Sequence, residues 1–191
     1  MSKGRLEAFS DGVLAIIITI MVLELRIPEE GTLSALQDLL PKFLSYVLSF
    51  IYLGIYWNNH HHLWQAVTGV SGSILWANLH LLFWLSLIPF ATGWMGENHF
   101  STIPVALYGA VLWFSALAYY IMVRVLLTHH SEDSLLAVAI GKDVKGLRSL
   151  YMYTAAVLLA FVAPWISMTL YVAVALMWLV PDRRIEDRLK N

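Results

Sequence analysis

Residues 5–23 read RLEAFSDGVLAIIITIMVL, so a charged and hydroxylated cluster lies directly against an uninterrupted apolar run. An ionised aspartate at hydrocarbon depth costs about 2.5–3.5 kcal/mol even on lenient insertion scales. We therefore expect Asp11 to face protein or water rather than lipid. The cluster and the run together are long enough to form a first membrane-spanning helix.

The composition of the whole chain agrees with a membrane protein. Of its 191 residues, 59% are hydrophobic and only 13% are charged, which lies outside the usual range of soluble proteins. The formal net charge of -1 argues against a nucleic-acid partner, because such a partner calls for a basic face. The absence of cysteine excludes disulfides, thiolate metal sites and thiol nucleophiles.

Charges, prolines and glycines divide the chain into six apolar segments of roughly spanning length. The last two come from one long apolar run that Pro164 interrupts, since proline lacks a backbone donor and clashes with the preceding turn. The sequence thus predicts an all-α integral membrane protein with a single domain over residues 1–191. The expected spans are 6–27, 43–65, 73–95, 104–127, 148–163 and 165–180.

An even number of crossings puts both termini on one side of the membrane. With this layout that side carries every lysine and arginine except Arg26 and Lys42. The positive-inside rule then predicts that both termini are cytoplasmic.

Periodicity along the first helix singles out one stripe. With about 100° per residue, Ile16, Thr19 and Leu23 share a line and Ile20 lies beside it. Such stripes are usually packing surfaces, and a threonine in a helix usually bonds the backbone four residues back. Asp11 lies about 140° away from Ile16, so we expect it between helices.

Several histidines fall inside the predicted spans. His60, His61 and His62 are consecutive, and adjacent helix positions point about 100° apart, so the three cannot easily converge on one ion. No carboxylate lies near His80, and we predict no metal site. We expect instead that His60, His61 or His80 hydrogen-bonds between helices to the first-helix cluster of Arg5, Ser10 and Asp11, in a network able to titrate. Arg5 and Asp11 are six residues apart and cannot pair on one helix face, so their pairing would need a bend or another chain.

Three stretches resemble the transmembrane protein 175 family, which comprises lysosomal potassium channels and their prokaryotic relatives. They are Arg-x-x-x-Phe-Ser-Asp at residues 5–11, with Phe9 at its centre, YWNNHHH at 56–62, and the segment from Asn78 to Phe90. The resemblance covers essentially the whole chain. It implies a prokaryotic plasma membrane protein whose pore is lined by the first helix.

The resemblance also assigns roles along that helix. It implies a potassium-selective, leak-like cation channel whose narrow apolar point is Ile16, with a selectivity layer at Thr19 and a further apolar position at Leu23. Animal members of the family carry two six-helix repeats and pair as dimers, whereas Phe-Ser-Asp occurs once here. The resemblance therefore implies that four copies complete the same pore, so we expect a homotetramer. Beyond the permeant potassium ion, no cofactor is implied.

No Thr-Val-Gly-Tyr-Gly filter is present, so a channel would use a constriction made of side chains. Glu29 and Glu30, just after the first helix, would enrich cations at the outer mouth or simply lie in a solvated loop. The alternatives are a proton-coupled secondary transporter and a proton-permeable channel. A membrane enzyme would require converging nucleophiles or metal ligands, which the sequence does not offer.

Overall fold

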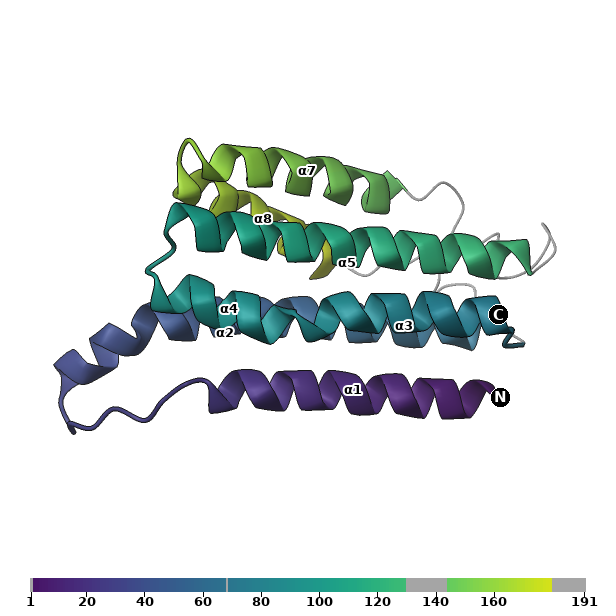
Figure 1. The fold of residues 1–191 in the computed structure, drawn as a ribbon, viewed down its shortest axis with the longest axis horizontal. Coiled ribbons are helices and arrows are strands. Elements are labelled where there is room, and N and C mark those ends of the chain that lie inside the picture. Colours follow the sequence, from purple (N-terminus) through teal and green to yellow (C-terminus); the bar gives the residue numbers. More distant parts are fainter. Residues whose placement is uncertain (1, 68, 130–143, 180–191) are drawn as a thin grey trace.

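The computed structural model describes residues 2–67, 69–129 and 144–179, and in this part of the chain every regular element is a helix (Figure 1). α3 and α4 follow one another through Leu87, so six helical segments lie along the bundle. This architecture confirms the all-α fold with six helices. The helices are α1 (Lys3–Leu23), α2 (Leu33–Gln65), α3 (Gly72–Ser86), α4 (Ile88–Glu97), α5 (Thr102–Thr128), α7 (Val144–Ala160) and α8 (Pro164–Leu179).

Four of the described segments are long and apolar enough to cross a membrane: α1, α2, the α3–α4 run from Gly72 to Glu97, and α5. α8 has 16 residues and begins at Pro164, where the long apolar run is broken. Sixteen residues rise about 24 Å, less than the roughly 30 Å of a hydrocarbon core. The described part of α8 is therefore shorter than the core is thick.

The break between α3 and α4 differs from the single helix expected over 73–95. Pro89 has no backbone N–H and cannot continue the α-helical pattern of hydrogen bonds. The N–H of Leu87 instead donates to the carbonyl of Trp84, three residues back, at 3.2 Å. α4 then starts with the proline in its first turn, where a missing donor costs least.

α2 also begins ten residues before the expected span, at Leu33. The Thr32 hydroxyl caps its first turn by accepting from the N–H of Ala35 at 3.4 Å. Pro41 lies inside the helix. The first turns of α2 extend beyond the rest of the bundle (Figure 1). The helix therefore extends past the segment that hydropathy selects.

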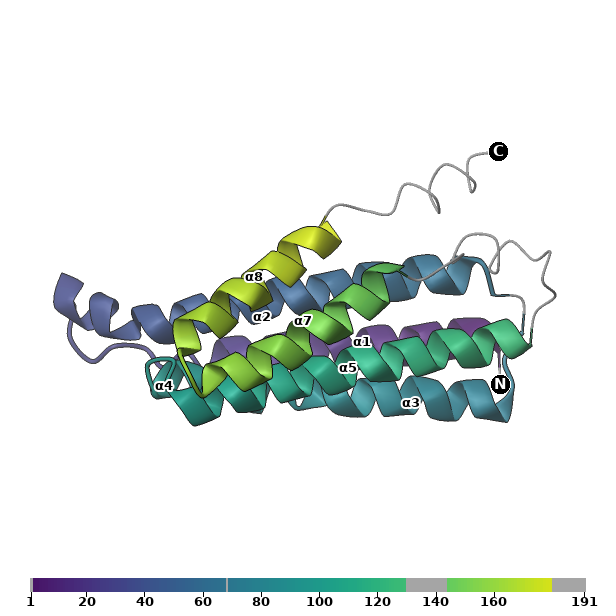
Figure 2. The same cartoon turned by 90° about the horizontal axis from the view of Figure 1, so that it is seen from above.

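α1 lies at one edge of the bundle and α7 at the opposite edge (Figure 1). α1 packs on α2, α3 and α4, while α5 joins α3 to α7, and α7 packs on α8. Seen from above, α2 and α3 flank α1 on either side (Figure 2). Among the described helices, α1, which carries the Arg-x-x-x-Phe-Ser-Asp motif, thus has neighbours on one side only.

α5 and α8 pack closely against each other at a junction centred on Tyr171. The buried hydroxyl of Tyr171 donates to the carbonyl of Val105 at 3.1 Å, and the Tyr171 carbonyl accepts from the Tyr52 hydroxyl at 2.6 Å. Tyr171 thereby contacts both α5 and α2. Its ring reaches α5 at Gly109, where a Cβ would overlap the hydroxyl and lie 2.7 Å from Cζ.

The two ends of the bundle differ in charge. α1 begins, α5 ends and α7 begins at one end, here called the motif end (Figure 1). The described basic residues of the motif end are Lys3, Arg5, Arg124, Lys145 and Arg148, whereas Arg26 and Lys42 belong to the far end. The positive-inside argument also used Lys142 and the basic residues after position 180. These lie outside the described residues.

Candidate pore helix and its polar network

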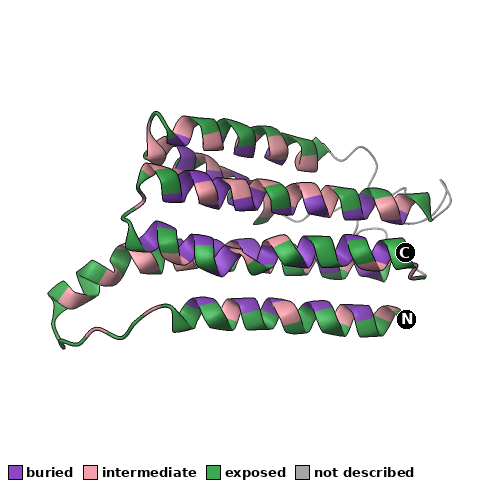
Figure 3. Ribbon diagram, viewed as in Figure 1, coloured by how far each residue is buried: buried purple, intermediate pink, exposed green. Residues whose placement is uncertain are grey.

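α1 has one buried face and one uncovered face (Figure 3). Its buried residues recur every three or four positions: Leu6, Ser10, Leu14, Ile17 and Met21. Such a spacing marks the packed side of a helix. The opposite side carries Ile16, which is 60% exposed, Leu23, which is 74% exposed, and the exposed Thr19. In the part of the chain that the structure describes, the predicted stripe is therefore not a packing surface.

Ser10 is completely buried and begins a chain of hydrogen bonds across three helices. Its hydroxyl donates to the carbonyl of Leu6 at 2.9 Å and accepts from Nδ2 of Asn78 on α3 at 3.0 Å. Oδ1 of Asn78 lies 2.8 Å from Nε2 of His60 on α2, and Nε1 of Trp64 lies 2.8 Å from the same nitrogen. His60 thus meets Ser10 through Asn78.

Nε2 of His60 lies within hydrogen-bond distance of two groups, Oδ1 of Asn78 and Nε1 of Trp64, but can bond to only one of them at a time. Asn78 presents its carbonyl oxygen, because its amide nitrogen is engaged by Ser10, and that oxygen calls for a proton on Nε2. The indole of Trp64 can only donate and calls for a lone pair on Nε2. One nitrogen cannot do both, so the buried cluster has two alternative hydrogen-bond arrangements, set by the histidine tautomer.

Asp11 lies on the exposed side of the motif and is held from α2. Its Oδ1 accepts a hydrogen bond from Nε1 of Trp57 at 3.1 Å. The Trp57 ring stacks on His61 with centroids 6.2 Å apart, and Nε2 of His61 lies 2.9 Å from Nε2 of Gln65. His61 therefore supports the partner of Asp11 and does not contact Asp11 through a hydrogen bond itself.

The other predicted members of the network lie apart from it. His80 is exposed, and its Nε2 accepts from Nε1 of Trp84 at 3.0 Å on its own helix. Arg5 and Phe9 point outward from the bundle, and within the described part of the chain Arg5 forms no ion pair with Asp11. The structure thus joins Ser10 to His60 and Asp11 to His61 indirectly, and leaves His80 and Arg5 out.

The uncovered face of α1 borders a groove of about 680 Å³ between α1 and α4. Ile16 and Ile20 form one wall, and Phe90 and Trp94 belong to the other. The Thr19 hydroxyl donates to the carbonyl of Ala15 at 2.8 Å, the backbone bond expected from sequence. Its oxygen still carries lone pairs for an ion or water.

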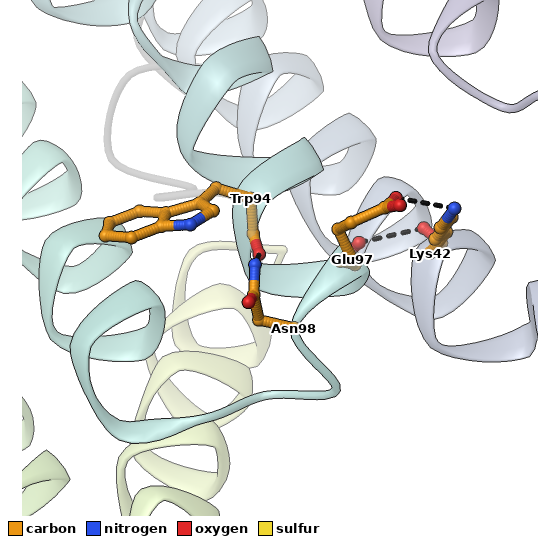
Figure 4. A network of polar contacts seen from close by, with 5 residues as sticks. Lys42, Trp94, Glu97 and Asn98 are labelled. Carbon is orange, nitrogen blue, oxygen red and sulfur yellow. Dashed lines mark hydrogen bonds and ion pairs between the residues drawn. The ribbon is translucent and has the colours of Figure 1, made fainter.

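At the far end of this groove α4 meets the start of α2 (Figure 4). Nζ of Lys42 lies 2.5 Å from Oε2 of Glu97, and the neighbouring Gly96 approaches so closely that a Cβ there would lie 2.7 Å from Cα of Lys42. Only glycine permits such proximity. Glu29 and Glu30 are exposed in the connection between α1 and α2.

The sequence did not single out three residues of these contacts: Trp57, Trp64 and Asn78. An asparagine inside an otherwise apolar span must find a polar partner, and this signal, which the sequence analysis did not use, could have identified Asn78. The tryptophans gave no such signal, because indole rings are equally common in ordinary packing. The described residues hold no group of three or more histidine, aspartate or glutamate side chains able to bind a metal.

A bundle of apolar helices with buried polar cross-links defines this chain as a multi-pass integral membrane protein. Residues 5–89 match the family model described as endosomal/lysosomal potassium channel TMEM175. A potassium channel of Chryseobacterium sp. (strain P1-3) is 57% identical over 191 residues, which is all of both chains. A potassium channel of Chamaesiphon minutus is 31% identical and covers 86% of this chain and 87% of its own length. The chain belongs to the TMEM175 family.

Further comparisons extend to animals and to a solved structure. The mouse endosomal/lysosomal proton channel TMEM175 is 29% identical over 85% of this chain and 36% of the mouse protein. The crystal structure of a lysosomal potassium-selective channel TMEM175 homolog from Chamaesiphon minutus matches with a TM-score of 0.81 at 28% identity, covering 93% of this chain and 96% of that one. The family consists of ion channels, and this chain is a channel protein rather than an enzyme.

Proposed function

We propose that the chain is a potassium-selective, leak-like cation channel that assembles as a homotetramer around α1. The observation that carries the proposal is the uncovered apolar face of α1, which begins directly after the signature motif. The face of α1 that carries Ile16, Thr19 and Leu23 is turned away from its own bundle and has no packing partner among the described residues. Four such faces around one axis would cover one another and enclose a path. The relatives named as potassium channels support this reading.

In this proposal Ile16 and Leu23 narrow the pore, Ile20 borders it, and Thr19 hydroxyls supply the only oxygen ligands there. Apolar rings gate by dewetting and offer nothing to replace an ion's hydration, so the preference for potassium over sodium is modest. The Ser10 and Asp11 contacts hold α1 in position, with Arg5 and Phe9 directed at neighbouring copies. Glu29 and Glu30 lie near the outer mouth and attract cations.

The described basic residues gather mainly at the motif end, which supports a cytoplasmic location for that end and for both termini. A prokaryotic plasma membrane is the proposed location, in keeping with the bacterial relatives.

The test is ion flux from purified protein in liposomes under opposed potassium and sodium gradients. A potassium-favouring reversal potential is expected. A saturable flux limited by turnover would instead indicate a proton-coupled transporter, and a reversal potential that follows an imposed pH gradient would indicate a proton channel. No contact among the described residues favours the proton-coupled transporter or the proton channel over the potassium channel. The mouse relative, however, is named a proton channel.

Thr19→Val is expected to lower the ratio of potassium to sodium permeability by about threefold, equivalent to about 0.65 kcal/mol, while current persists. The substitution keeps the shape of the side chain and removes its oxygen. The measurement is the reversal potential in the same liposomes. Thr169→Val is the matched control, because Thr169 on α8 is also exposed and also donates to the backbone four residues back, at 2.9 Å. Equal ratios in wild type and Thr19→Val would remove Thr19 from the pore.

A further inference from the structure

A second groove, of about 730 Å³, runs between α2 and α8. Its size lies within the usual range of sites for small ligands, about 300–1000 Å³. Leu44 and Ile51 from α2 face Val172 and Leu176 from α8, and the one titratable residue among those that line it is His99. The groove is therefore an apolar trough with one imidazole among its lining side chains.

The mouth of the trough is built differently from its floor. His99, Phe100 and Trp165 line the groove where α4 ends and α8 begins, at the far end of the bundle. Exposed tryptophan is typical of the interface between hydrocarbon and headgroups, where its ring is in an apolar layer and its N–H in a wet one. The mouth thus has the composition of a headgroup-level site.

Backbone geometry at the mouth is unusual. His99 and Phe100 have φ values of 49° and 58°, so two successive residues other than glycine adopt the left-handed conformation. They end α4 in a Schellman motif, a common way for a helix to terminate, in which the N–H of His99 donates to the carbonyl of Gly96 at 3.3 Å. Here the N–H of Phe100 donates to the carbonyl of Met95 at 3.0 Å, which fixes the turn and keeps His99 at the groove.

The groove lies away from the uncovered face of α1. α8 packs on α7, which lies at the edge of the bundle opposite α1 (Figure 1), whereas α1 packs on α2, α3 and α4. Both walls belong to a chain embedded in the membrane. A chain of lipid hydrocarbon is the material that reaches a surface of this kind at this depth.

We propose that this groove binds one glycerophospholipid, whose acyl chain lies between α2 and α8 and whose phosphate lies beside His99 and the indole N–H of Trp165. The acyl chain fills the space between the two helices and extends from the mouth of the groove along α8 to Leu176. This site is independent of ion conduction through α1.

The experiment is native mass spectrometry of the full-length protein in detergent with added phosphatidylglycerol. Val172→Trp fills the trough and is expected to reduce retained phospholipid about tenfold, the loss that follows when roughly two methylene groups no longer reach the protein. Ile103→Trp is the matched control, since Ile103 is also apolar, exposed and at the far end but does not line the groove. It is expected to retain lipid like the wild type.

The headgroup position is tested with His99→Ala and two lipids of equal chain length. Retention of phosphatidylglycerol is expected to fall, whereas retention of diacylglycerol, which has no phosphate, is expected to stay unchanged. Equal loss of both would overturn the phosphate position. Wild-type retention by Val172→Trp would overturn the site, as would a smaller oligomer with unchanged lipid per chain, because a second copy would then occupy the groove. None of these readouts uses ion flux, so they are separate from the test of channel function.

Discussion

Liposomes that contain Ile16→Asn are expected to pass potassium about tenfold faster than liposomes with the wild-type protein, which corresponds to a barrier lowered by about 1.4 kcal/mol. Ile16 is 60% exposed on α1 and turned away from its own bundle. In the proposed pore its ring of side chains excludes water, and an amide in its place allows the constriction to hydrate. Flux under a potassium gradient measures the change.

The matched control for this substitution is Val22→Asn. Val22 lies on the same helix and is also exposed, at 45%, but it points about 120° away from Ile16. The same polar change there should leave the flux close to wild type. If both variants conduct alike, or if neither differs from wild type, Ile16 is not at the narrow point of a pore.

Gly109→Ala is expected to destabilise the protein by about 2–3 kcal/mol and to lower its Tm in detergent by about 5–10 °C. A Cβ at this position overlaps the Tyr171 hydroxyl, so the ring must move and its bond to the Val105 carbonyl is lost. The gain of about 1 kcal/mol from replacing glycine in a helix is smaller than this cost.

Gly54→Ala controls for the helix propensity term, because a Cβ at Gly54 on α2 meets no atom within 4 Å. That variant should melt at the wild-type temperature or slightly above it. In Gly109→Ala, the added change Tyr171→Phe removes the overlapping hydroxyl and should restore part of the loss. Equal melting of the Gly109 and Gly54 variants would contradict the described junction.

Hydropathy and proline positions were sufficient to predict the helical class and the break at Pro164. They could not predict where α2 begins, because the turns before Pro41 are too polar for a span and yet are capped and helical. They also missed the break at Leu87, since a proline near the end of an apolar run is read equally well as a terminus.

Sequence periodicity located the stripe of Ile16, Thr19 and Leu23 on α1. It could not determine whether other helices of the same chain cover this stripe or leave it exposed. That distinction depends on which neighbours pack on α1, which is a tertiary property. The same holds for the histidines. Three candidates were chemically equivalent in the sequence, and only the positions of Asn78 and Trp57 on neighbouring helices determine that His60 and His61 reach the motif while His80 does not.

The two close glycine contacts have different consequences for how this chain diverges over evolutionary time. At Gly109 the obstacles are the side chains of Tyr171 and Val157, so alanine becomes acceptable once Tyr171 has changed to a smaller residue and Val157 has shifted, and positions 109 and 171 should vary together among descendants. At Gly96 the obstacle is the Cα of Lys42, which every residue possesses. No replacement at position 42 can make room, so position 96 should remain glycine in each lineage that keeps α2 and α4 in contact.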